Sequence, residues 1–254
     1  AHHDGDRRPE ARELLRRLER RGARDLAGDG DDELQIDHGE TIQPAGAAGH
    51  VPGTSMTVIY YLSHPEVTID PATPVPDWGL SATGRARVLA VRDAAWLRPC
   101  RRIVTSAERK AVETAELIAE ASGAAMLAGA GRPGDARSAR GFWAPAEFEQ
   151  VADAFFAQPH ESVRGWERAI DAQARITAEL EAVLAEHDPT LPLLLVGHGG
   201  VGTLLYCRHA GLAIDRRHDQ PKGGSVFALD ARSLAPRFAW RPMEEVGRPG
   251  SVSV

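Results

Sequence analysis

Thr57-Val-Ile-Tyr-Tyr-Leu-Ser-His64 and Leu191-Pro-Leu-Leu-Leu-Val-Gly-His198-Gly-Gly decide the fold expected of this 254-residue chain. Each stretch is a short apolar run that ends at a histidine, which is typical of a buried parallel strand with a polar residue at its carboxyl end. Ligands of open α/β sheets bind at that end of the strands. We therefore expect both imidazoles to meet at one edge of a sheet.

Strand-like runs alternate with helical periodicity from residue 56 onward. The expected strands are 57–62, 101–105, 192–196, 224–229 and 237–241, and the expected helices are 81–97, 107–122, 146–157, 164–187 and 200–211. This alternation predicts an α/β fold, a three-layer sandwich whose mostly parallel central sheet is flanked by helices. Ser106 is placed to cap the helix that starts at Ala107, and Gly199-Gly200 opens another helix. Both helix starts would direct backbone N–H groups to one sheet edge, where they favour an anion such as a phosphoryl group.

Composition excludes several classes of protein. The chain is 43% hydrophobic and 26% charged, with a net charge of -6, so it offers no basic surface for nucleic acid. Its apolar runs are too short to cross a membrane, no leader segment is recognisable, and Cys100 and Cys207 are isolated, so we expect a cytoplasmic protein. Metal-binding clusters are lacking, and Gly129-Ala-Gly-Arg-Pro-Gly134 does not open a helix, so we expect neither a metal nor a nicotinamide or other cofactor.

Residues 1–55 differ in composition from the rest of the chain. They hold 8 Arg and 12 Asp or Glu, one possible helix over Pro9–Leu26, and Gly- and Ala-rich stretches typical of flexible linkers. We expect an N-terminal extension over 1–55 ahead of a domain over 56–254. The extension could belong to the protein or be a remnant of cloning.

Four segments of this domain occur in the order and spacing of one known family. They are Leu62-Ser-His-Pro-Glu66, Gly79-Leu-Ser-Ala-Thr-Gly84, Thr105-Ser-Ala-Glu-Arg-Lys-Ala-Val-Glu-Thr-Ala115 and Val196-Gly-His-Gly-Gly-Val201. They resemble the histidine phosphatase superfamily, also called phosphoglycerate-mutase-like. Its corresponding sequences are Arg-His-Gly-Glu after a strand, Leu-Thr-x-x-Gly, Ser-x-x-x-Arg-Ala-x-x-Thr-Ala and Ser-His-Gly-Gly-Val.

The resemblance implies phosphoryl transfer in two steps. His64 would attack phosphorus as a neutral imidazole, and water would hydrolyse the resulting phosphohistidine, while His198 stabilises the equatorial oxygens. The family takes its proton donor from a carboxylic acid in the segment after the helix that contains Lys110. Asp135 is the first candidate for this donor, followed by Glu66 and then Glu147.

The expected contacts to the phosphoryl group are Ser63, Glu66, Lys110 and Gly199. Here the chain departs from the family: Ser63 replaces the first arginine, Pro65 replaces a glycine, and Lys110 replaces the second arginine. Lysine keeps the charge but lacks the planar fork that binds phosphate with two hydrogen bonds.

Two functions therefore remain open. One is a cofactor-independent phosphatase acting on a phosphorylated small molecule or a phosphorylated protein side chain, with low activity. The other is a phosphate-binding or regulatory protein of the same fold that has lost turnover. Four cations near the motifs could compensate for the missing arginine: Arg85, Arg102, Arg137 and Lys222. A further group is expected in the core rather than in a ligand site: Phe142, Trp143, Phe148, Phe155, Phe156 and Trp166.

Overall fold

The computed structural model describes residues 57–128 and 143–247; the N-terminal extension expected over 1–55 lies outside them. The elements in chain order are β1 (Val58–Ser63), η1 (Val75–Asp77), α2 (Ala82–Val91), β2 (Arg102–Thr105), α3 (Arg109–Ser122), β3 (Ala125–Ala128), α4 (Pro145–Ala157), η3 (Val163–Gly165), α5 (Ala169–Ala185), β4 (Leu193–Gly197), α6 (Gly199–Ala210), η4 (Arg216–His218), β5 (Ser225–Asp230), β6 (Pro236–Pro242) and η5 (Met243–Glu245).

The strands form one sheet in the order β3-β2-β4-β1-β5-β6. Neighbouring strands from β3 to β1 are parallel, whereas β5 is antiparallel to both β1 and β6. The mostly parallel sheet is therefore confirmed, and the five expected strands lie within one residue of their predicted bounds. All five residues of β4 are buried, as expected of a central strand covered on both faces.

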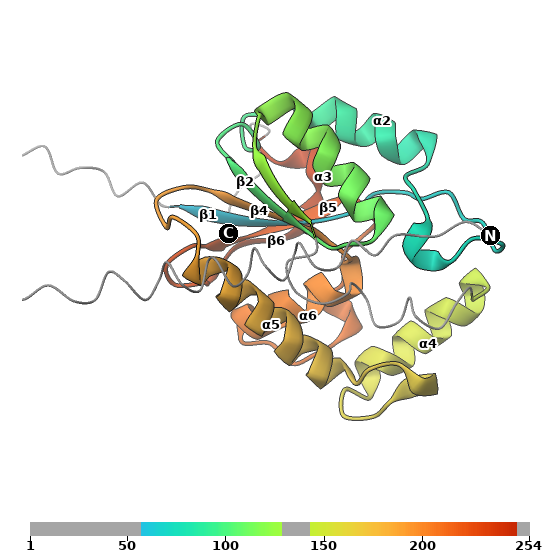
Figure 1. Ribbon diagram of the computed structural model, residues 1–254. Coiled ribbons are helices and arrows are strands. Elements are labelled where there is room, and N and C mark those ends of the chain that lie inside the picture. Colours follow the sequence, from blue (N-terminus) through green and yellow to red (C-terminus); the bar gives the residue numbers. More distant parts are fainter. Residues whose placement is uncertain (1–56, 129–142, 248–254) are drawn as a thin grey trace, which may run out of the picture. The chain divides into compact units, whose positions relative to one another are not determined.

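Helices cover both faces of the sheet, which completes the predicted sandwich. Figure 1 shows α2 and α3 on one face and α5 and α6 on the other. Side chains from alternate strand positions form a separate core on each side, with Leu62 and Ile118 in one and Ile59 and Leu180 in the other. A third apolar cluster joins α4 to α5 and α6. Within the described ranges, no helix is both long enough and apolar enough to span a membrane.

Two helices are shorter than their periodicity predicts. The helix expected over 81–97 ends at Val91, and tight turns over the next residues allow both Trp96 and Leu97 to enter the core. The helix expected over 164–187 begins only at Ala169, because Arg164 has a φ of 47°, in the left-handed region, and the backbone is extended at Trp166 and Arg168.

The structure corrects one further expectation about local structure and adds a strand that was not predicted. Ser106 is not the N-cap of α3, because that helix begins at Arg109 and Glu108 occupies the cap position. The Ser106 hydroxyl instead accepts a hydrogen bond from the Glu108 N–H at 3.3 Å. Strand β3 was not predicted: it is a four-residue strand at the sheet edge with three exposed residues, and its run Ala-Met-Leu-Ala contains none of the β-branched or aromatic residues found in the other strands.

The start of α2 supports the loop that follows His64. Ser81 caps the helix, because its hydroxyl accepts a hydrogen bond from the Gly84 N–H at 3.1 Å. The backbone N–H of Ser81 donates to the Glu66 carbonyl at 2.9 Å. A Cβ atom added to Gly84 would lie only 2.2 Å from that carbonyl oxygen. Glycine is therefore required here for close packing of helix against loop.

Gly84→Ala is expected to lower the free energy of unfolding by about 1 to 3 kcal/mol, because the backbone must move to admit the new Cβ atom. Intrinsic helix propensity alone predicts the opposite sign, a gain of up to about 1 kcal/mol. Urea unfolding of the two proteins decides between these effects. Thr83→Ala, an exposed change in the same helical turn, serves as the control. A Gly84→Ala variant as stable as the original chain would contradict this account of the packing.

Candidate active site

The two histidines meet at the carboxyl edge of the sheet, as the two apolar runs predict. Strands β1 and β4 are parallel neighbours with Ser63 opposite Gly197, so the next residue of each chain segment is a histidine. The His64 N–H donates to the Gly197 carbonyl at 2.9 Å, which extends the pairing by one residue. The imidazole centroids of His64 and His198 are 5.2 Å apart, with the rings at 72°.

His64 is held as a neutral imidazole with one nitrogen available. Its Nδ1 lies 2.9 Å from the Pro65 carbonyl, which can only accept, so Nδ1 carries the proton and Nε2 carries the lone pair. Burial is the main reason why the pKa of His64 is lowered to about 3, and the nearby His198 and Lys110 act in the same direction. An unprotonated Nε2 is what a nucleophilic histidine requires.

His198 is fixed through both its backbone and its ring. The Tyr61 hydroxyl donates to the His198 carbonyl at 3.1 Å and accepts from the His198 N–H at 3.2 Å. The ring Nε2 lies 2.9 Å from the Ser106 hydroxyl and 3.7 Å from a carboxylate oxygen of Glu108. Since α6 begins immediately afterwards, at Gly199, its first N–H groups open beside this ring.

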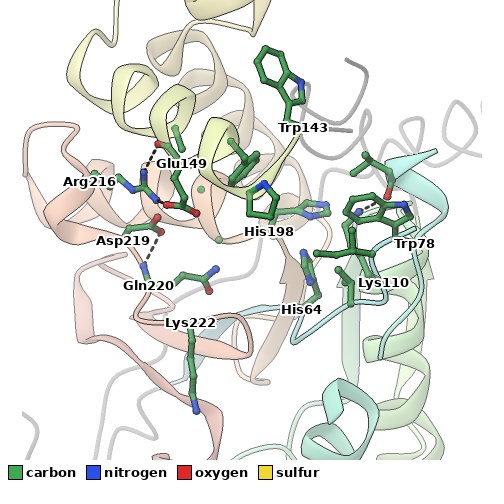
Figure 2. A pocket seen from close by; sticks show the side chains of 18 of the residues that line it. His64, Trp78, Lys110, Trp143, Glu149, His198, Arg216, Asp219, Gln220 and Lys222 are labelled. Carbon is green, nitrogen blue, oxygen red and sulfur yellow. Dashed lines mark hydrogen bonds and ion pairs between the residues drawn. The ribbon is translucent and has the colours of Figure 1, made fainter. Parts of the chain in front are cut away.

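Lys110 is buried and not the solvated helix residue that its charge alone suggests. Its side chain is only 6% exposed, and its Nζ donates to the Val75 carbonyl at 2.9 Å, an interaction drawn as a dashed line in Figure 2. The same Nζ forms an ion pair with the Glu108 carboxylate, which is equally buried. A buried charge needs such a partner, and here the partner also cancels the positive charge that Lys110 brings to the site.

A pocket of about 560 Å³ opens over the two histidines. Its lining includes His64, His198, Lys110, Gly199 and Gly200, and beyond them Val67, Ile69, Val75, Trp78, Trp143, Pro145, Phe148, Glu149, Ala152, Phe156, Trp166, Arg216, Asp219, Gln220, Pro221 and Lys222. In Figure 2 the histidines lie between the α4 side of the pocket, with Glu149 and Arg216, and the Trp78 side. No group of three or more metal-ligating side chains occurs among residues 57–128 and 143–247.

The aromatic residues expected in the core divide between two roles. Phe155, Phe156 and Trp166 belong to the buried cluster under α4, as expected. Trp143 and Phe148 line the pocket, and so do Phe156 and Trp166 of the buried cluster. The expectation that these aromatic residues belong to the core rather than to a ligand site is therefore wrong, because the same residues do both. Phe142 lies outside the described residues.

The other predicted site residues lie in different places. Gly199 lines the pocket, whereas Ser63 is fully buried beneath it. Glu66 does not line the pocket; its carboxylate accepts from Arg87 at 2.7 Å. Asp135 lies outside the described residues. Glu147, the third candidate for the proton donor, pairs with Arg164 on the surface and does not line the pocket.

The cations that could replace the missing arginine are also dispersed. Arg85 lies 3.9 Å from Glu113, and Arg102 donates to the Glu186 carbonyl at 2.8 Å, both away from the pocket lining. Lys222 lines the pocket, but Figure 2 shows its side chain directed away from His64. Arg137 lies outside the described residues.

Several residues of this site were not predicted from the sequence, and three of them bear directly on its geometry. Glu108 follows the end of β2 by three residues and could be suspected only from its proximity to Lys110 in the chain. Tyr61 is recognisable as a strand residue, but nothing in the sequence indicates that its hydroxyl holds His198. Gln220 comes from the loop between η4 and β5, and its place in the pocket depends on tertiary structure alone.

Comparisons with known proteins agree with this architecture. Many solved structures are similar, among them the three that follow, all at identities that establish the fold alone. A mycobacterial glucosyl-3-phosphoglycerate phosphatase complexed with VO3 has 24% identity and a TM-score of 0.57 over 73% of this chain and 99% of its own. YhfR of Bacillus stearothermophilus has 21% identity and a TM-score of 0.59, over 73% and 96%. TTHB049 of Thermus thermophilus has 20% identity and a TM-score of 0.52, over 72% and 99%.

A search of curated protein sequences found no significant match. The sequence profile of the histidine phosphatase superfamily (branch 1) matches residues 69–232, which is more than half of the chain and includes β2, α3, β4 and α6. This match agrees with the fold and includes His198, whereas β1 and His64 lie ahead of the matched residues. The chain belongs to the histidine phosphatase superfamily.

Proposed function

We propose that this protein hydrolyses a phosphomonoester through a phosphohistidine formed on Nε2 of His64. The observation that carries the proposal is the state of this imidazole at the base of the pocket. Its Nδ1 proton is held by the Pro65 carbonyl and its pKa is about 3, so Nε2 has a lone pair at any physiological pH. The second ring, His198, lies beside it, with 5.2 Å between the ring centroids.

In this proposal the surrounding groups stabilise charge on the phosphoryl oxygens. Because the transition state spreads negative charge over three equatorial oxygens, catalysis depends on donors that are already oriented toward them. His198, Lys110 and the first N–H groups of α6 supply such donors around His64. In the second step, water attacks the phosphohistidine and releases inorganic phosphate and the free imidazole.

The leaving oxygen needs a proton, and we keep Asp135 as the first candidate for its donor. Glu66 and Glu147, the second and third candidates, are each paired with an arginine and do not line the pocket. This arrangement weighs against both, because a general acid must come within hydrogen-bonding distance of the leaving group.

A small phosphorylated molecule fits the pocket better than a protein segment. Its volume of about 560 Å³ lies within the range typical of small-molecule sites, roughly 300 to 1,000 Å³. The aromatic side chains of Trp78, Trp143 and Phe148 could contact the part of such a molecule that leaves with the oxygen.

A second function, phosphate binding without turnover, is favoured by two specific observations. The site has Ser63 where the family has an arginine, and the positive charge of Lys110 is cancelled by Glu108. Both features reduce stabilisation of the transition state. The two functions differ in whether any turnover depends on His64.

His64→Ala is expected to reduce hydrolysis of an aryl phosphate by more than about a thousandfold, because the covalent step loses its nucleophile. Steady-state rates of the purified full chain measure this effect. His160→Ala removes an exposed histidine outside the pocket and should leave the rate unchanged. Rapid acid-free quenching of the original chain should also trap phosphate on His64. Equal rates in the His64→Ala variant and the original would contradict the proposal, and no turnover in either would favour phosphate binding alone.

The low pKa of His64 predicts a pH response that NMR can measure without substrate. A lowered pKa means that the neutral form persists as pH falls until the pH approaches the folded-state value of about 3. The NMR signals of the His64 imidazole can be assigned by their absence from the spectrum of the His64→Ala variant. In the original chain, the chemical shifts of these signals should therefore not change between pH 8 and 5. A midpoint near the unperturbed value of about 6.5 would show that burial does not hold this ring neutral.

A further inference from the structure

Ser63 reaches the pocket only through another side chain. Its hydroxyl is fully buried, accepts from the Ser225 N–H at 3.1 Å and lies 3.2 Å from the Ser225 carbonyl. The same hydroxyl donates to the side-chain carbonyl oxygen of Gln220, a residue 157 positions further along the chain. Gln220, and not Ser63, lines the pocket.

Gln220 is held at both its backbone and its side chain. Its backbone N–H donates to Asp219 Oδ1 at 2.8 Å, and that oxygen also accepts from the Thr203 hydroxyl on α6 at 2.7 Å. At the other end, the hydrogen bond from Ser63 occupies Oε1 and thereby sets which face of the amide carries the NH₂ group.

The NH₂ group of Gln220 lies beside the start of α6. A Cβ atom added to Gly199 would lie 1.9 Å from Nε2, so the amide occupies the space that the glycine leaves open. Gly199, His64 and His198 line the same pocket, and Figure 2 shows the Gln220 side chain extending toward His64. The Nε2 donor is thus directed to the region where the proposed function requires a phosphoryl group.

We propose that Gln220 is a phosphate-binding residue, donating from Nε2 to a phosphoryl oxygen, and that Ser63 is a positioning residue that orients its amide. This inference rests on the phosphate site of the proposed function. An oriented amide donates a hydrogen bond without adding charge. The pocket would therefore bind phosphate with a neutral donor on the side where the family has an arginine.

Phosphate binding tests the inference independently of catalysis. Isothermal titration of the full chain with inorganic phosphate should show Gln220→Ala binding about tenfold more weakly, the loss expected for one hydrogen bond to a charged group. Gln220→Glu should lose more, because it keeps the shape and can still accept from Ser63 but places an anion against the phosphate. Gln158→Ala, an exposed glutamine outside the pocket, is the matched control and should bind normally.

The positioning role of Ser63 is tested by a double-mutant cycle. Ser63→Ala should weaken phosphate binding several-fold in the original chain but have no further effect in the Gln220→Ala background. Equal losses in both backgrounds would overturn the positioning role, since a purely structural defect does not depend on Gln220. If the Gln220→Ala variant does not fold, the phosphate affinity of the Gln220→Glu variant still tests whether the side chain at this position contacts phosphate.

The outcomes separate this inference from the proposed function. Unchanged phosphate affinity in Gln220→Ala and Gln220→Glu would overturn the assignment of Gln220, whatever the turnover. Weakened phosphate binding in a protein that never hydrolyses phosphomonoesters would support Gln220 and contradict hydrolysis. Absence of phosphate binding in the original chain would overturn both.

Discussion

The parallel pairing of β1 with β4 is the constraint on which the site depends. With Ser63 opposite Gly197, the two strands end together, and the histidine after each one is delivered to the same point. A shift of one residue in this register would turn every side chain of β1 to the opposite face of the sheet. The apolar cores on both faces therefore stabilise the register, and the register determines the distance between the imidazoles.

The charges around the two histidines differ from those that the sequence motifs alone suggest. Lys110 is buried where a phosphate-binding cation is expected, but Glu108 is buried against it, and His64 is neutral. The described residues closest to His64 therefore bring little net positive charge. Since burial of an unpaired lysine is costly, Glu108 makes the position of Lys110 possible while reducing its attraction for an anion.

The sequence predicted what depends on long apolar runs and local motifs. Strands such as β4 are covered on both faces, so their runs are distinctive, whereas the exposed edge strand β3 is a short Ala-Met-Leu-Ala run without a β-branched or aromatic residue. Trp96 continues the helical spacing of α2 but enters the core from a turn, which periodicity cannot distinguish. In the site, His64 and His198 follow from the strand ends. Gln220 could not be predicted, because its position depends on contacts that Ser63 and Asp219 make with it in the folded protein.

Ser63 and Gln220 constrain each other by steric packing as well as by a hydrogen bond. Ser63 has no exposed surface, and the volume above it is taken by the Gln220 amide, so a long cation at position 63 and this placement of Gln220 exclude each other. A small buried hydroxyl and an oriented amide form one self-consistent arrangement. Its donors, the amide and the first N–H groups of α6, are dipoles fixed before a ligand arrives. Preorganised dipoles stabilise developing charge without reorganisation, so low net charge is compatible with the proposed function.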